Sequence, residues 1–140
     1  ITHYLGKISQ PLLERIDICT EVPAIQFPEM KKKKGGESSS AIRRRVERTQ
    51  EIQRERYKNE KFSFNGELDG RHVEKYCEMT AEAEMLLEQA YTQFQFSTRA
   101  YHKILKVART VADMEGTEKI QSEHICEALT YRAYDKKYWS

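Results

Sequence analysis

The stretch from Ser97 to Gly116 constrains the fold most, because it carries the start, the period and the end of one long amphipathic helix. Ser97 suits the N-cap position, where its hydroxyl accepts a hydrogen bond from an amide of the first turn. Gly116 suits the residue after the last turn, because glycine enters the left-handed conformation without a Cβ clash. We therefore expect a helix with one face in a core. The apolar side chains recur every three or four residues, at Tyr101, Ile104, Leu105, Ala108, Val111 and Ala112.

The opposite face of this predicted helix is cationic. It carries Arg99, Lys103 and Lys106 at helical steps, with Arg109 nearby. A charged face behind an apolar stripe is typical of a solvated helix surface. On the residues alone, we expect these cations to lie at the surface.

Helical signals also cover the rest of the C-terminal half. Thr80 is the expected N-cap of a helix that ends before Ser97, and Ser122 is the expected N-cap of the last helix. A short helix is expected over residues 71–78, after a loop at 58–70 that contains two turn signals. Three helices with tight connections predict a small antiparallel bundle, so the expected fold class is all-α. In the last helix, the residues expected to face inward are Ile125, Cys126, Leu129 and Ala133.

Basic residues are concentrated between Lys31 and Lys61, where twelve Lys or Arg stand against five Glu, although the whole chain has a net charge of only +2. The run Lys31, Lys32, Lys33, Lys34 lies in a predicted flexible linker, residues 24–37. It is either a solvated loop or a loop that contacts the phosphates of a nucleic acid. A long helix is predicted over Ser38–Tyr57, and its narrow apolar edge (Ile42, Val46, Thr49, Gln53) indicates a peripheral position. The arginines Arg43, Arg44 and Arg45 then face solvent, a partner subunit or DNA.

Residues 1–23 have a different character. Asp17–Val22 alternates apolar and polar side chains, which predicts a half-buried strand that Pro23 ends. A single strand needs a sheet, so we expect the edge of a preceding α/β domain, with a short helix around Pro11. The chain opens with Ile1 and not with Met, which suggests a piece of a longer protein. The expected domains are therefore the edge at 1–23, the linker at 24–37 and a helical domain at 38–140.

No complete catalytic site can be assembled from the sequence. The glycines fit neither GxxxxGK[ST] nor GxGxxG, and the histidines lack metal-ligand spacing, so no metal site is expected. His102 is expected to pack partly against the helix stripe, and His124 is expected at the surface. Asp113 and Glu115 have no obvious carboxylate partner for acid–base chemistry. A self-contained enzyme is not expected.

The cysteines and the hydropathy indicate the compartment. Cys19, Cys77 and Cys126 are an odd number without a CxxC pair, which argues against a disulfide framework and favours a reducing, cytoplasmic compartment. No apolar run approaches the ~20 residues that a membrane span needs. No membrane partner is therefore expected.

Four segments, in this order and spacing, carry a resemblance to a known family. They are QPLLERIDICTEVP (Gln10–Pro23), SSSAIRRRVERTQEIQRERY (Ser38–Tyr57), STRAYHKILKVARTVADMEG (Ser97–Gly116) and IQSEHICEALTYRAYD (Ile120–Asp135). They resemble the C-terminal region of magnesium-chelatase-like AAA+ ATPases, in particular the competence-protein-M type. Two departures are that Gln10 stands where the family usually has Gly, and Glu14 where it has Asp.

The resemblance implies the last helix and strand of an AAA+ core followed by the helical lid. It implies that the full-length protein binds ATP and Mg²⁺. It also implies that neighbouring subunits form a ring, expected to be a hexamer. The work of this ring would be the remodelling of DNA by branch migration in recombination and transformation. This fragment alone is expected neither to bind ATP tightly nor to hydrolyse it, and no cofactor is expected in it, because the phosphate loop would lie upstream. Arg15 resembles the arginine finger that reaches a neighbour's ATP, and Arg99 the sensor-2 arginine, with Arg109 as the alternative. On the residues alone, Arg15 is an ion-pair partner of Glu14 or Asp17.

Two other functions remain open on the sequence. One is a helical adaptor that binds nucleic acid or protein without nucleotide. The other is a genuine chelatase subunit, which acts with partner subunits to insert Mg²⁺ into a porphyrin. A protease is less well supported, because no nucleophile and base occur together.

Overall fold

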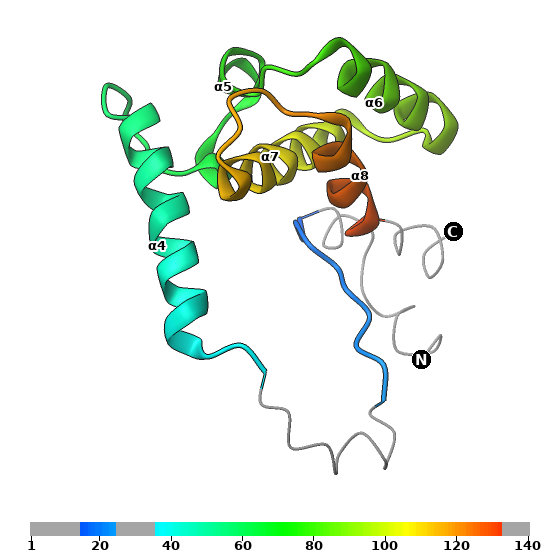
Figure 1. The fold of residues 1–140 in the computed structure, drawn as a ribbon. Helices are drawn as coiled ribbons and strands as arrows, with labels where there is room; N and C mark the ends of the chain where they lie inside the picture. The colour runs from blue at the N-terminus through cyan, green and yellow to red at the C-terminus, as the bar shows by residue number, and fades with distance from the viewer. Residues whose placement is uncertain (1–14, 25–35, 133–140) are drawn as a thin grey trace.

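The computed structural model describes residues 15–24 and 36–132 (Figure 1). The described part consists of helices α4 (Ser39–Arg56), α5 (Gly70–Tyr76), α6 (Ala81–Phe94), α7 (Thr98–Glu115) and α8 (Ser122–Thr130), with a 3₁₀ turn η1 (Asn65–Glu67). Within these residues the only β pairing is one isolated parallel bridge between Met79 and Ile120. The all-α prediction is confirmed.

Helix α7 is the centre of the domain, and α4, α5, α8 and η1 all pack against it (Figure 1). Both predicted ends are confirmed. The Oγ of Ser97 accepts a hydrogen bond from the amide of Ala100 at 3.2 Å. Gly116 ends the helix in the left-handed conformation, with φ of 76°. Any residue with a side chain would be strained in this conformation.

The apolar stripe of α7 forms the core, as its period predicts. Ile104, Leu105 and Ala108 are buried, and Tyr101 packs at the edge. The other helices and the loops between them contribute the remaining buried side chains, and full burial of each large aliphatic side chain is worth about 1.5–3 kcal/mol. These partners include Leu68, Val73, Leu87, Ile120 and Ile125.

Two details of α8 differ from the sequence prediction. The helix begins after Gln121, so Ser122 is its first residue and not its cap. The amide of Gln121 donates to the Nδ1 atom of His124 at 2.9 Å, which satisfies the helix start without a hydroxyl. Cys126 is exposed, and Ala128 lies in the core in its place. Ala133 lies outside the described residues.

Helix α4 packs along only half of its length (Figure 1). Its C-terminal half buries Thr49 and Gln53 against the domain. Its N-terminal half projects from the body, and Ile42 and Val46 remain 41% and 46% exposed. The predicted apolar edge is therefore confirmed only where a neighbouring element exists to cover it.

The strand predicted at Asp17–Val22 is wrong for the described structure. These residues have no regular secondary structure, and Ile18 and Val22 are exposed. A strand exists only when a neighbour completes its hydrogen-bond ladder, and no such neighbour lies among the described residues. Instead, one backbone bond joins the Cys19 amide to the Tyr131 carbonyl at 3.1 Å.

Candidate functional site

The cationic face of α7 binds other segments of the chain and is not simply solvated. Lys103 is only 15% exposed; its Nζ donates to the carbonyl of Arg15 at 2.7 Å and pairs with the carboxylate of Asp17. Lys106 donates to the carbonyl of Gly66 in η1 at 3.1 Å. Two of the expected surface cations therefore hold neighbouring elements against α7.

The segment that carries Arg15 is fixed at three points. Besides the contacts of Lys103, a guanidinium nitrogen of Arg132 donates to the carbonyl of Ile16 at 2.6 Å. The backbone of Cys19 bonds to that of Tyr131 at the end of α8. The side chain of Arg15 is exposed beside these anchors.

Asp17, one of the two carboxylates considered as an ion-pair partner of Arg15, pairs with Lys103 in the described structure. Glu14, the other carboxylate considered, lies outside the described residues. The backbone of Arg15 is thus anchored near α7 and the end of α8, while its side chain is exposed to solvent.

Arg99 lies in the first turn of α7, next to the capped end. It is exposed and stands one turn before Lys103. Residues four apart share a helix face, so Arg99 lies on the side of α7 that holds the Arg15 segment. The structure therefore brings Arg15 and Arg99 to one side of α7.

Arg109 does not join them. It lies ten residues further along α7, about 15 Å along the axis, and its expected surface position is wrong, because it is 1% exposed. Its Nε donates to Asp113 at 3.1 Å, and its two terminal nitrogens donate to the carbonyls of Glu118 and Thr117 at 2.5 and 2.6 Å. Burial lowers the pKa of this guanidinium, and the carboxylate of Asp113 opposes the effect.

Asp113 is the centre of a buried polar cluster that the sequence did not reveal. Its carboxylate accepts both terminal nitrogens of Arg56, the amide of Asn65 at 2.9 Å and the Nε of Arg109. The Tyr57 hydroxyl donates to Asn65 at 2.6 Å, and burial raises the pKa of Tyr57 to about 12. The cluster joins α4, η1 and α7. Only the i, i+4 spacing of Arg109 and Asp113 could have signalled part of it.

His124 is also buried, so its expected surface position is wrong. Its Nδ1 accepts from Gln121, so the proton lies on Nε2, which donates to a carboxylate oxygen of Glu115 at 2.8 Å. This bond ties α8 to the end of α7. His102 packs partly buried, as predicted, and its ring lies 3.1 Å from where a Cβ on Gly70 would stand.

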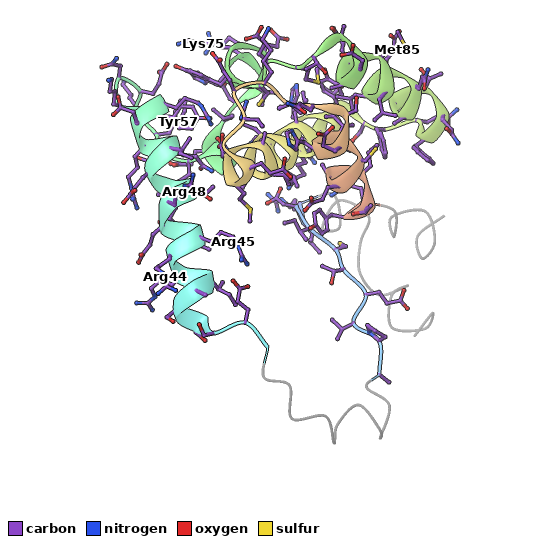
Figure 2. The ribbon with its side chains drawn as sticks, viewed as in Figure 1. Arg44, Arg45, Arg48, Tyr57, Lys75 and Met85 are labelled. Atoms are coloured by element: carbon purple, nitrogen blue, oxygen red, sulfur yellow. The ribbon has the colours of Figure 1, made fainter. Side chains whose placement is uncertain are left out.

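The predicted nucleic-acid residues are only partly described. Lys31, Lys32, Lys33 and Lys34 lie outside the described residues. Arg43 and Arg44 are exposed on the projecting half of α4, whereas Arg45 pairs with Glu37 at 2.7 Å (Figure 2). This half of α4 is a cationic surface.

The described residues offer a groove but no metal-binding cluster. The groove has a volume of about 570 Å³ and opens between α5, α6 and α7. Across the described ranges, no three His, Cys, Asp or Glu side chains converge as metal ligands would. Among the helices described, none combines the length and apolar character needed to cross a bilayer.

Comparison with known proteins places this arrangement in a family. Residues 36–132 match the family described as "Magnesium chelatase, subunit ChlI C-terminal". The chain is 37% identical over 134 residues to Competence protein ComM of Haemophilus influenzae, covering 95% of this chain and 26% of that protein. It is 36% identical over 137 residues to the uncharacterized protein YifB of Salmonella typhimurium, with coverage of 95% and 26%. The uncharacterized protein Rv2897c of Mycobacterium tuberculosis is 29% identical over 129 residues, with coverage of 92% and 25%. The chain thus spans about a quarter of the length of these curated relatives. It belongs to the magnesium-chelatase-like family of the ComM type, and its residues 36–132 are the ChlI C-terminal domain of that family.

Proposed function

We propose that this chain is the lid region of a ring-forming AAA+ ATPase, and that it presents Arg15 to the nucleotide of a neighbouring subunit and Arg99 to a nucleotide at the lid. The observation that carries this proposal is the bond from Lys103 to the carbonyl of Arg15. It couples the Arg15 segment to the helix whose first turn bears Arg99. A movement of the lid would therefore move both arginines together.

The chemistry of the two arginines suits phosphate. A guanidinium is permanently charged and planar, so it can bridge two phosphate oxygens and stabilise the charge that develops during phosphoryl transfer. The start of α7 adds partial positive charge next to Arg99. Both side chains are exposed, whereas that of Arg109 is buried, with only 1% of the residue exposed. The geometry therefore favours Arg99 over Arg109.

The described residues supply only part of an ATP site. They supply cations, but no three acidic or histidine side chains among them converge to hold Mg²⁺. The residues that cradle the phosphates and the metal would belong to the remainder of the full-length protein. ATP with Mg²⁺ would supply the free energy of hydrolysis. Arg15 and Arg99 of this chain would orient the phosphates and stabilise the negative charge that develops on them.

For the work done by the ring, we propose remodelling of DNA, with branch migration as the specific reaction. One relative is named a competence protein, which points to DNA taken up in transformation. Arg43, exposed on α4, supplies a cation that suits phosphate contact.

The test uses the full-length protein with Arg15→Ala and Arg99→Ala. We expect Arg15→Ala to lower kcat for ATP hydrolysis by about 10³-fold, the lower end of the range for arginine fingers, with nucleotide binding retained. Arg71→Ala, a change at an exposed arginine on α5, is the matched control and should leave kcat unchanged. A loss of less than about threefold for Arg15→Ala would refute the role of Arg15.

Mixing the two variants tests which subunit each arginine serves. If Arg15 acts on a neighbour and Arg99 on its own subunit, a ring of both variants contains intact sites and regains activity. If both serve the same subunit's nucleotide, or both a neighbour's, every site lacks one arginine and mixing gives no rescue. The rescue is measured as ATP hydrolysis at a fixed total subunit concentration.

A helical nucleic-acid adaptor is the second candidate, because the projecting half of α4 is cationic. It predicts DNA binding without nucleotide and with a steep salt dependence. Charge reversal at Lys31–Lys34 would then abolish binding. If ATP hydrolysis is absent in the full-length protein while this binding is present, the adaptor replaces the ATPase proposal.

A further inference from the structure

The groove between α5, α6 and α7 combines carboxylates with aromatic rings. Glu84 and Glu88 stand one turn apart on α6, and Glu74 faces them from α5. Tyr91 and Tyr101 form another wall, edge to face, with ring centroids 5.8 Å apart. Burial and the charges of Glu84 and Glu74 raise the pKa of Tyr101, as expected if these carboxylates face the groove.

This lining selects a cation with a flat, extended shape. Carboxylates bind a guanidinium by paired charge-assisted hydrogen bonds, and aromatic faces attract the same group. Met85, on the neighbouring face of α6, is 61% exposed and offers an apolar contact beside the carboxylates (Figure 2). The expected occupant is therefore an arginine-rich segment with some apolar side chains.

The projecting half of α4 has that composition. Arg44 and Arg48 are exposed one turn apart, and in the described part of the chain neither forms an ion pair (Figure 2). Ile42 and Val46 are exposed on the same half of the helix. Two positions four residues apart are separated by about 6 Å along any α-helix, so the spacing of these arginines matches that of the two glutamates on α6.

We propose that this groove receives the projecting half of α4, residues 39–48, from a second copy of the chain. Helix α6, which forms one wall of the groove, and the projecting half of α4 lie at opposite ends of the described structure (Figure 1), so one copy cannot fill its own groove. The contact is head to tail, and repeated head-to-tail contacts close into a ring when the rotation permits. The inference goes beyond the proposed ATPase role, because it requires a second copy but no nucleotide.

DNA is the competing ligand for these arginines. It would cover α4 but could not enter the groove, because the three glutamates would repel its phosphates. The two occupants therefore make different predictions for the α6 carboxylates. Binding of a second copy requires them, whereas binding of DNA to α4 does not.

The first experiment is cross-linking in the full-length protein without nucleotide. Glu88→Cys and Arg44→Cys are made separately, each with Cys126→Ser to remove the exposed native thiol. Mild oxidation of the mixture should give a covalent dimer, and neither variant alone should give it. Arg54→Cys, at an exposed position on the packed half of α4, replaces Arg44→Cys in the matched control and should give none.

Charge reversal supplies the second measurement, by sedimentation without nucleotide. Glu84→Arg with Glu88→Arg, or Arg44→Glu with Arg48→Glu, should each weaken association about tenfold. Mixing the two reversed proteins should restore it, and circular dichroism checks that each remains helical. Absence of the cross-link, or an equal yield from Arg54→Cys, overturns the proposal. So does a result in which the α4 reversal abolishes DNA binding and the groove reversal changes no association. If the cross-link forms but the unmodified full-length protein does not hydrolyse ATP, the result contradicts the ATPase proposal alone.

Discussion

The Asp113 carboxylate should be the most sensitive polar group in the domain. Asp113→Asn keeps the size of the side chain but removes the negative charge between Arg56 and Arg109. The side chain of Arg56 is 21% exposed and can turn towards water, whereas that of Arg109 is 2% exposed and cannot. The cost therefore arises mainly from one buried guanidinium that loses its counter-ion.

The size of the effect follows from this burial. Removing one partner of a buried ion pair costs about 3–5 kcal/mol. The carbonyls of Thr117 and Glu118 still accept from Arg109, which places the expected loss near the lower end of that range. Since small domains are stable by about 5–15 kcal/mol in total, this is a large fraction.

Urea unfolding followed by circular dichroism measures the loss. With a denaturant slope of about 2 kcal/mol per molar, the midpoint should fall by about 1.5–2 M. Glu55→Gln is the control, because it breaks an exposed pair with Lys58 and should cost less than about 0.5 kcal/mol. If Asp113→Asn shifts the midpoint no more than this control, Asp113 does not hold the two guanidinium groups as described.

Three further outcomes are expected. Ser97→Ala should lower the unfolding free energy by about 1 kcal/mol, measured by urea titration, because it removes the cap of α7. Cys126 should react with a thiol reagent in the folded protein while Cys77 is protected, because burial raises the pKa of Cys77 to about 12; equal labelling rates would contradict its burial. The hydrogen bond from Lys75 lowers the pKa of Glu60, so this carboxylate stabilises the fold above its unfolded-state pKa and the benefit is lost as the pH falls through the folded value. Urea midpoints measured between about pH 6 and about pH 3 should fall less steeply in Glu60→Gln.

Local signals identified the central helix because all of them lie within α7 or at its ends. Ser97, Gly116 and the apolar period act through contacts a few residues apart, so their meaning can be read without the rest of the chain. The same argument explains why Thr80 was identified correctly as the cap of α6. At α8 the predicted cap was one residue too late. The cap is Gln121, whose amide donates to the ring of His124, and the hydroxyl of Ser122 is not used.

The candidate site could be predicted only in part. The residue types of Arg15 and Arg99, and their resemblance to family motifs, were visible in the sequence. That Lys103 joins the two regions was not visible, because it bonds to a segment 88 residues earlier. A lysine that binds a distant backbone has the same sequence signature as a lysine in water.

By itself, the sequence determined the all-α class and the central helix with its caps, because these depend on short-range backbone geometry and on the 3.6-residue period. Only the tertiary structure decided which charges are buried. Asp113 meets Asn65 and Arg56 across 48 and 57 residues, and the strand pattern at Asp17–Val22 found no partner to pair with among the described residues. Burial and pairing depend on which elements fold against each other, and no local pattern encodes that choice.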